Sequence, residues 1–555
     1  MNMKTEKDLL IEVDHLKKQL EKIKDKKKYG LVWDAEREPE EVVLDCRKKL
    51  PILMEKEKKK IIDKKYDQTN LLIEGDNYHS LSVLNYTHKE KVDFVYIDPP
   101  YNTGAKDWKY NNDYVDENDL WRHSKWVSFM EKRINLSRSI LKKDGVICCT
   151  IDDYEIFSLL GIFESLNANI IGVVTIVNKA EGRNQKKYFT GGIEYAVFAT
   201  WGNPKMRGLL LEGDNICESC GKKINGKKSK EISEDGREFE WVGFHRRNPI
   251  DDPTSSNRWY PIYVSKKGEI SVNKTKDSIE VFPINNKGEN KIWGWKKERL
   301  AEYLKENPDD FKAKKYSQNG EEKITILYKR YGEDRVKPKS YWIGSKYNAY
   351  SYGTKLIKEI LQTKETKFEF PKSLYAVIDC IDLFLPKDGL VLDYFAGSGT
   401  TGHAVLYLNK KDQGSRKFIL CTNNENKICE EVTYERIKNV IKGYGTVKGL
   451  GGNLRYYKTD FVETENLDNA TDQDKIELTY KAGEMIAIRE DTFDEVEKND
   501  WWQIFSNGKE ATAIYFKEDK SKLQKLVDKL DKMNKKVNLY IFSWGKNEYT
   551  NEFPE

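Results

Sequence analysis

The chain carries the sequence VDFVYIDPPYN at residues 92–102, and the rest of the predicted fold is arranged around it. Its first six residues are mostly β-branched or aromatic, and the run is too short for a helix, so a strand is predicted. Pro99 and Pro100 end this strand, because a proline cannot donate to a sheet ladder. The turn presents the Asp98 carboxylate, backbone carbonyls and the ring of Tyr101. A strand that simply ends in a proline turn explains the same residues equally well.

A second strand-and-turn motif, LVLDYFAGSGTTG, occupies residues 390–402. Here a buried strand is predicted to enter a glycine turn, and a helix follows. Glycines at such a turn let the backbone approach a ligand closely, with the helix N-terminus behind it. Gly397, Gly399 and Gly402 have the spacing of a dinucleotide-binding turn, and Glu425 follows the next predicted strand as an acid for ribose hydroxyls. Taken alone, this motif favours a nicotinamide or flavin enzyme as much as any other class.

The two motifs together resemble those of one enzyme family. The sequence Asp98-Pro99-Pro100-Tyr101 is similar to the catalytic motif of DNA adenine-N6 and cytosine-N4 amino-methyltransferases. Their S-adenosylmethionine-binding motif is matched by Asp393, Phe395, Gly397 and Gly399, and their ribose-binding acid by Glu425. The catalytic motif comes first in the chain, which resembles the circularly permuted β group of these enzymes. The pair of motifs therefore favours a methyltransferase over a dehydrogenase.

The resemblance implies two further residues near the cofactor, S-adenosylmethionine, and no metal. Asp76 follows a predicted strand just before the catalytic strand, where the family has an acid near the adenine of the cofactor. A helix cap explains Asp76 equally well. Lys372 follows Pro371 in a motif whose backbone and lysine lie near the methionine end of the cofactor in the family.

Composition narrows the class of protein. The 555 residues are 38% hydrophobic and 34% charged, which suits a soluble protein of two to four domains. No run of 18 apolar residues occurs and the start lacks an apolar segment, so neither a membrane span nor a signal peptide is expected, and the predicted location is cytoplasmic. A net charge of +5 neither proves nor excludes nucleic-acid binding. Only Cys217 and Cys220 have metal-ligand spacing, and without a second pair a zinc site is not expected.

The order of predicted elements gives the fold class: a Rossmann-like α/β methyltransferase fold, circularly permuted, with an insertion. The strands that complete the sheet arrive late in the chain, so an insertion must separate its two halves. Five parts are expected: an N-terminal amphipathic helix at 1–28, the first half of the methyltransferase domain at 29–204, an inserted target-recognition domain at 205–350, the second half at 351–448 and a small α+β domain at 453–555.

Three local predictions concern individual segments. Residues 102–119 are expected to form a loop, whose aromatic residues either close over a base or pack on the surface. Asn178, Arg183 and Phe189 match the region beside the target base in the family. In the C-terminal part, strands are predicted at 485–488, 513–516 and 539–543, with a helix at 521–533.

The inserted part mixes basic with aromatic residues, as around Phe244, Arg258 and Trp293. Such a mixture suits phosphate contacts and base stacking. Over residues 70–440 the chain resembles the modification (Mod) subunits of type III restriction-modification systems. That resemblance implies double-stranded DNA as substrate and a nuclease-helicase restriction subunit as partner. The helix at 1–28 is expected to dock on its own protein, with a homodimer or partner contact as the alternative.

The reaction that the resemblance implies is methyl transfer to adenine N6 in a base rotated out of the duplex. Asp98 and the Pro99 carbonyl would accept the amino hydrogens, and the ring of Tyr101 would stack on the base. Alternatives are cytosine N4 as the acceptor, RNA as the substrate, a solitary methyltransferase without a restriction partner, and a subunit whose catalysis is incidental to its complex.

Overall fold

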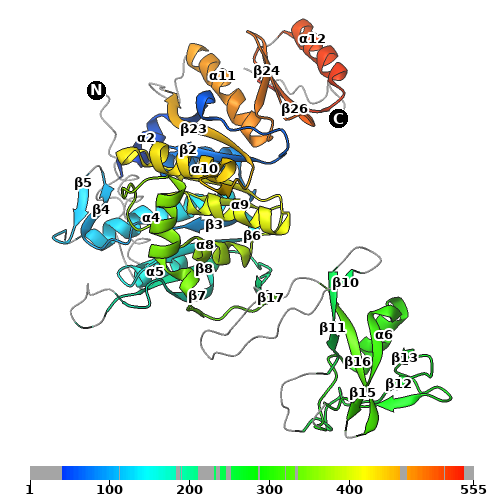
Figure 1. Ribbon diagram of the computed structural model, residues 1–555. Helices are drawn as coiled ribbons and strands as arrows, with labels where there is room; N and C mark the ends of the chain where they lie inside the picture. Colours follow the sequence, from blue (N-terminus) through cyan, green and yellow to red (C-terminus); the bar gives the residue numbers. More distant parts are fainter. Residues whose placement is uncertain are drawn as a thin grey trace, which may run out of the picture. The chain divides into compact units, whose positions relative to one another are not determined.

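The chain forms two compact units, Met1–Leu209 with Lys337–Glu555, and Leu210–Val336 (Figure 1). The computed structural model describes residues 40–111, 113–119, 121–182, 188, 190–210, 231–232, 238–245, 252–285, 288–318, 320–331, 335–462, 472–517 and 519–542. The helix expected at 1–28, Arg183, Phe189 and the cysteine pair 217/220 lie outside the described residues.

In the described part of the larger unit, ten strands form the central sheet, in the order β1-β23-β2-β20-β19-β3-β6-β8-β7-β18. Their bounds are β1 Leu50–Glu55, β2 Thr69–Glu74, β3 Val92–Ile97, β6 Leu141–Ile151, β7 Asn169–Val177, β8 Ile193–Thr200, β18 Tyr341–Trp342, β19 Leu390–Asp393, β20 Lys417–Thr422 and β23 Asn453–Val462. The strands from β23 to β6 run parallel, and β6, β8 and β7 pair antiparallel, with β7 and β8 forming a hairpin.

Helices cover both faces of this sheet (Figure 1). One face packs against α3 (Asn77–Thr87), α4 (Arg122–Ile140) and α5 (Ile156–Ser165); the other packs against α8 (Leu374–Asp382), α9 (Thr400–Asp412) and α10 (Glu435–Lys442). Alternate residues of β3 enter the two cores, Val95 and Ile97 on one side and Phe94 and Tyr96 on the other. The predicted Rossmann-like α/β architecture is confirmed.

The remaining short elements of this unit lie at its margins. They are α2 (Glu41–Lys48), α7 (Leu356–Ile360), β21 (Gly443–Tyr444) and β22 (Val447–Lys448). The strands β9 (Leu209–Leu210) and β17 (Arg335–Val336) lie where the chain leaves and re-enters the larger unit.

The loop predicted at 102–119 is wrong, because the segment forms a hairpin of β4 (Ala105–Tyr110) and β5 (Asp113–Asp116). Trp108 and Tyr110 are buried, and Trp108 packs 5.3 Å from Phe129 between ring centroids. The two aromatic residues are two positions apart and so share one face of a strand. The many Asn and Asp residues around them hid this alternation.

The C-terminal part combines the helices α11 (Asp472–Arg489) and α12 (Lys520–Leu530) with the strands β24 (Asp494–Lys498), β25 (Trp502–Ser506), β26 (Glu510–Tyr515) and β27 (Lys536–Ile541). The strand predicted at 485–488 is wrong, because these residues form the last turn of α11. A short apolar run does not distinguish a strand from the buried side of a helix. Ile486 and Ala487 pack against Phe505 and Ile514 of the neighbouring sheet.

The described residues of the smaller unit include a four-stranded sheet, a three-stranded sheet and an α-helix. One sheet has the order β10 (Glu231–Ile232), β11 (Glu238–Gly243), β16 (Glu321–Tyr331) and β15 (Phe311–Gln318); the other comprises β13 (Ile270–Ser271), β12 (Ile262–Val264) and β14 (Ile279–Val281), and the helix is α6 (Lys297–Glu306). Phe244, Tyr260 and Trp293 are buried in its core. The mixture of basic and aromatic residues suggested base stacking without saying which residues take part; these three belong to the core instead.

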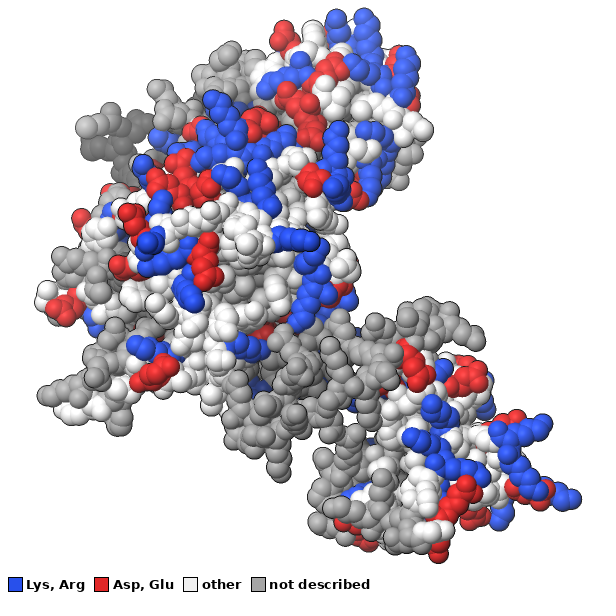
Figure 2. All heavy atoms as spheres, in the orientation of Figure 1, with Lys and Arg blue, Asp and Glu red and all other residues white. Residues whose placement is uncertain are grey.

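Charged side chains of both signs mix over the face shown in Figure 2, as a net charge of only +5 would suggest. None of the helices in the described part of the chain is long and apolar enough to cross a membrane.

Candidate active site

Two distant segments meet at one edge of the central sheet. The strands β3 and β19 are parallel neighbours, with Phe94 opposite Val391 and Val95 opposite Leu392. Asp98 directly follows β3, and Asp393 is the last residue of β19. In open parallel sheets, ligands bind in the crevice outside the carboxyl ends of the strands. Both motifs therefore lie where a ligand is expected.

The Asp98 carboxyl is held by one of its two oxygens. Its Oδ1 lies 2.7 Å from the Thr150 hydroxyl, 3.0 Å from the Tyr101 hydroxyl and 3.1 Å from the Lys372 ammonium. No described residue donates to Oδ2. Burial raises the pKa of Asp98, while Lys372 opposes this effect and Glu194 adds to it. One oxygen thus fixes the carboxyl, and the other can accept from a ligand.

Lys372 joins the catalytic motif to a second carboxylate. Its ammonium lies 2.7 Å from Glu194 Oε2, hydrogen-bonds to the Tyr101 hydroxyl and stands 4.5 Å from the centroid of the Tyr101 ring. Burial lowers the pKa of Lys372, but Asp98 and Glu194 outweigh burial and raise it overall. The ammonium is therefore charged, and the group of two carboxylates and one ammonium carries a net negative charge when both acids are ionised.

Glu194 is a site residue that the sequence interpretation missed. It is the second residue of β8 and is only 4% exposed. Its Oε2 also accepts from the Asn178 amide at 3.2 Å, so Asn178, a predicted site residue, does lie beside the catalytic motif. An acid within the apolar strand IEYAVFAT was the available signal, because a buried carboxylate needs a partner.

Hydrogen bonds from neighbouring residues hold the proline turn in place. The Trp126 indole donates to the Pro100 carbonyl at 2.7 Å, whereas no described residue donates to the Pro99 carbonyl. Asn102 has a left-handed backbone (φ +58°), and its buried side chain accepts from the Trp108 indole at 3.0 Å and donates to Glu155. The turn is thereby held with Asp98, the Pro99 carbonyl and Tyr101 at the sheet edge.

The Asp393 side chain stabilises the glycine turn through hydrogen bonds within it. It accepts from the Phe395 backbone N–H at 3.0 Å and from the Thr401 hydroxyl at 2.6 Å. It is 2% exposed, and this burial raises its pKa to about 7. Gly397 and Gly399 have left-handed backbones, with φ +46° and +76°. A Cβ at Gly397 would come within 2.9 Å of the Phe368 ring, so only glycine fits this turn without a shift.

The other predicted cofactor residues take part in contacts of their own. Phe395 is half-buried and packs 5.9 Å from Phe129 between ring centroids. Asp76 caps α3, accepting from the Tyr78 backbone N–H at 2.7 Å, as the capping interpretation expects. Because α3 follows β2 in the same parallel sheet, Asp76 lies at the carboxyl edge.

Glu425 lies just beyond β20 and contacts the β4–β5 hairpin. Its carboxylate is 2.6 Å from the Lys109 ammonium and accepts from the Tyr114 hydroxyl at 3.1 Å. A ribose hydroxyl that binds Glu425 must therefore compete with two side chains of the hairpin. The hairpin thus reaches the predicted cofactor side of the sheet edge.

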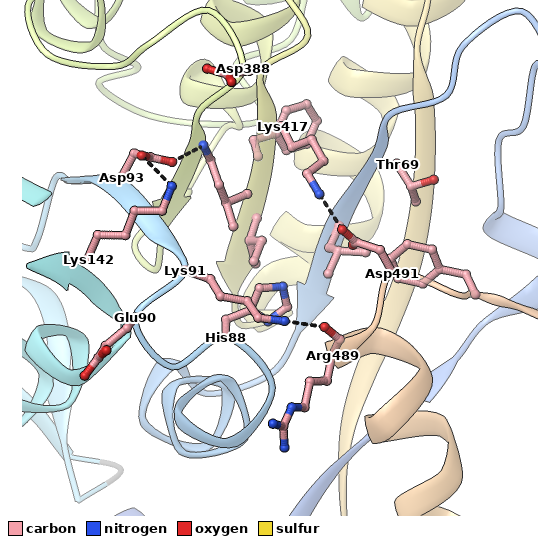
Figure 3. Close-up of a pocket in the computed structure, with 15 residues that line it drawn as sticks. Thr69, His88, Glu90, Lys91, Asp93, Lys142, Asp388, Lys417, Arg489 and Asp491 are labelled. Carbon is pink, nitrogen blue, oxygen red and sulfur yellow. Dashed lines mark hydrogen bonds and ion pairs between the residues drawn. The ribbon is translucent and has the colours of Figure 1, made fainter. Parts of the chain in front are cut away.

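A separate cavity of about 290 Å³ lies at the opposite, amino edge of the sheet (Figure 3). The first residues of several strands and the segment after α11 line it, and its charged groups pair with one another. Asp93 accepts from Lys142 at 2.7 Å, and Lys417 lies 2.7 Å from Asp491. None of the predicted catalytic or cofactor residues lines this cavity.

Known proteins resemble this chain over the same region. Residues 92–435 match the family model described as DNA methylase (N6_N4_Mtase). The chain is 31% identical over 359 residues to the type II methyltransferase M.KpnI of Klebsiella pneumoniae, covering 63% of this chain and 79% of that protein. It is 29% identical over 428 residues to the type III restriction-modification enzyme EcoPI Mod subunit of Escherichia phage P1, covering 67% and 62%.

A further Mod subunit, StyLTI of Salmonella typhimurium, is 28% identical over 399 residues, covering 67% of this chain and 55% of that protein. The match thus spans less than two thirds of the length of either Mod subunit.

Proposed function

The chain belongs to the DNA methylase family, and we propose on this basis that it transfers a methyl group from S-adenosylmethionine to adenine N6 in double-stranded DNA. The observation that carries the proposal is the pairing of β3 with β19, which sets the motif Asp98–Tyr101 beside the glycine turn. The base reaches this edge by rotating out of the duplex.

The residues of the catalytic motif activate and orient the amine. The lone pair of an exocyclic amine is delocalised into its ring, so the nitrogen is a poor nucleophile. Asp98 Oδ2 and the Pro99 carbonyl, to which no described residue donates, accept the two amino hydrogens and draw the nitrogen towards a tetrahedral shape. Tyr101 holds the base by stacking. Fixing both reactants at one edge supplies about 7–11 kcal/mol of the barrier reduction.

The glycine turn and its neighbours fit the cofactor. The left-handed Gly397 and Gly399 leave backbone without side chains at the sheet edge, as close approach to a ligand requires. We assign Asp393, Phe395, Gly397, Gly399, Glu425, Asp76 and Lys372 to its site. S-adenosylmethionine, when bound, supplies an electrophilic methyl group. Asp98 stabilises the positive charge that develops on the amine as the new bond forms.

The partners follow from the same proposal. The similarity to two proteins named as type III Mod subunits supports a place in a restriction-modification system, with a restriction subunit as partner and the smaller unit as the target-recognition domain. We also propose that the protein forms a homodimer and is located in the cytoplasm.

Nucleoside analysis of DNA from cells that express the protein tests this function, with Asp98→Ala as the control. N6-methyladenine at one sequence motif, absent from the control, is the expected result. N4-methylcytosine instead would keep the mechanism and change the acceptor base. If DNA from both samples lacks a modified base and the purified protein modifies no duplex, the proposed function is wrong.

A further inference from the structure

Glu194 is a buried carboxylate to which the mechanism above gives no role. Two donors from different parts of the chain converge on its Oε2: the Lys372 ammonium at 2.7 Å and the Asn178 amide at 3.2 Å. The Tyr101 hydroxyl lies 3.3 Å from the same oxygen, but its one hydrogen has a closer acceptor in Asp98, at 3.0 Å. A buried charge is costly unless it is paired. A buried carboxylate held in this way beside the catalytic motif calls for a functional explanation.

The arrangement divides one cation between two carboxylates. Lys372 lies 3.1 Å from Asp98 and 2.7 Å from Glu194, so the closer partner is the carboxylate that does not belong to the catalytic motif. Without Glu194, Asp98 would be the only carboxylate that Lys372 contacts among the described residues. A partly buried ion pair is stronger than one in water, because the local dielectric constant is lower. A tighter pair of Lys372 with Asp98 Oδ1 would then turn the Asp98 carboxyl and misplace Oδ2 for the substrate amine.

We propose that Glu194 is a positioning residue, which holds the Lys372 ammonium between two carboxylates and so leaves Asp98 free to accept the amine. The inference rests on the proposed methyltransferase function and concerns the same site. Glu194 acts through Lys372 and is not assigned a contact with substrate.

Groups from every side of the site bear on the titration of Asp98. Lys372 precedes α8 and lowers the pKa of Asp98, whereas Glu194 on β8 raises it. Among the described residues, other titratable groups that interact with Asp98 are Tyr96 on β3, Tyr101 in the turn, Cys148 and Cys149 on β6, and Asp393 on β19, and Asp152 beyond β6 interacts with Tyr101. The substitution Glu194→Gln removes the charge of Glu194 and changes the pairing of Lys372. It alters none of the other groups directly.

The test measures the rate of a single methylation turnover on duplex DNA against pH, using the full-length protein. For Glu194→Gln we expect the rate to fall by roughly 10- to 100-fold, because Asp98 is misplaced by its tighter pair with Lys372. The acidic limb of the profile should move to lower pH, because one negative neighbour of Asp98 is gone. A purely structural role for Glu194 would leave this limb in place.

A double-mutant cycle shows whether Glu194 acts through Lys372. In a Lys372→Met background, Glu194→Gln should cause no further loss of rate. Glu55→Gln is the matched control, because Arg455 is likewise shared between Glu55, at 2.9 Å, and Asp494, away from the catalytic motif. This variant should keep both the rate and the acidic limb of the wild type.

Several outcomes would overturn the inference: additive losses in the cycle, an acidic limb that stays in place or moves to higher pH, or the same profile change in Glu55→Gln. If Glu194→Gln fails to fold, Glu194→Asp serves in its place, because aspartate keeps the negative charge on a side chain shorter by one methylene group. This variant should retain the acidic limb of the wild-type pH profile. A shifted acidic limb in Glu194→Asp contradicts the inference. Normal wild-type methylation together with an unaffected Glu194→Gln rejects only this inference. A wild type that methylates nothing rejects the proposed function as well.

Discussion

Asp98 is the residue on which the proposed chemistry depends most directly. Thr150, Tyr101 and Lys372 engage its Oδ1, and Oδ2 faces no described donor. We expect Asp98→Ala to lower the methylation rate by on the order of 10²–10³-fold, as removal of a preorganised polar group does elsewhere. The affinity for S-adenosylmethionine, measured by titration calorimetry, should stay near that of the wild type. Equal loss of rate and of cofactor affinity would contradict the assignment of Asp98 to the amine.

Tyr101 is expected to act with both its ring and its hydroxyl. The sequence suggested only stacking, whereas the hydroxyl also bonds to Asp98 at 3.0 Å and contacts Lys372. Tyr101→Ala should weaken capture of the rotated base by about 1–3 kcal/mol, the worth of one stacking contact. Tyr101→Phe should retain capture and lower only the rate. A fluorescent base analogue at the target position reports capture, and equal capture by both variants would exclude stacking.

The buried Asp393, in the predicted cofactor turn, makes the stability of the folded protein depend on pH. Burial raises its pKa from 3.8 to about 7, so between about pH 4 and pH 7 the folded protein holds a proton that the unfolded chain releases. This residue therefore contributes stability at low pH that is lost as pH rises through about 7. In Asp393→Asn, the midpoint of thermal unfolding should fall less than in the wild type between about pH 5.5 and pH 8. Identical pH slopes in both proteins would contradict the buried titration.

At the scale of elements, the local sequence predicts where many strands lie, but it does not predict which strands are neighbours in the sheet. The runs at β3 and β19 were predicted from their apolar residues and from the turns that end them. Their adjacency depends on a pairing across almost three hundred residues, which no local pattern contains, so only the family resemblance brought the two motifs together. Thr150 was missed because the local sequence of β6 is that of an ordinary strand. Glu194 was missed although an acid in the apolar strand β8 was a signal, because that signal does not say which residues the acid pairs with.

In the turn between β19 and α9, Gly399 has a left-handed backbone that disfavours any side chain. Gly399 has φ +76°, and a Cβ there would lie 3.2 Å from Thr433. Gly399→Ala should cost about 1–2 kcal/mol of stability, the price of a left-handed backbone in an L-residue, and should weaken S-adenosylmethionine binding.

Gly320→Ala provides the control for this prediction. Gly320 has φ +83° and open surroundings in the smaller unit. It should show a similar loss in urea unfolding with unchanged cofactor affinity. If cofactor affinity falls in both variants or in neither, the turn between β19 and α9 is not the cofactor site.

At the scale of the whole chain, the two edges of the central sheet differ in the residues that they bring together. The carboxyl edge gathers the catalytic and cofactor motifs. At the amino edge, Lys417 pairs with Asp491 and Lys91 donates to the Arg489 carbonyl, which ties the segment after α11 to the sheet (Figure 3). The C-terminal part thus packs against the amino edge of the central sheet, away from the edge where the chemistry is proposed. Nothing in the local sequence pointed to this division.

One sheet face of the smaller unit carries three lysines. Lys312 and Lys314 alternate along β15 with the core residues Phe311 and Ala313, so they lie on the face away from the core, and Lys323 opposes Tyr316 on that face. Lys312 stands 3.9 Å from the centroid of the Trp241 ring. Within the described part of the chain, none of these three lysines forms an ion pair. A basic face with an aromatic residue is what the proposed target-recognition role requires once Phe244 and Trp293 are assigned to the core.

Replacing Lys312, Lys314 and Lys323 together by Gln should weaken duplex binding and flatten its salt dependence. Each lysine that contacts a phosphate contributes roughly 0.9 to the slope of log affinity against log salt concentration. Lys315→Gln is the matched control, because Lys315 lies on the other face of β15, the one that carries Phe311 and Ala313, and pairs with Glu322 at 3.0 Å. Fluorescence anisotropy over a salt series measures both slopes. If the triple variant keeps the wild-type slope, or if the control flattens it as much, DNA does not bind through this face, and the target-recognition surface must lie elsewhere on the chain.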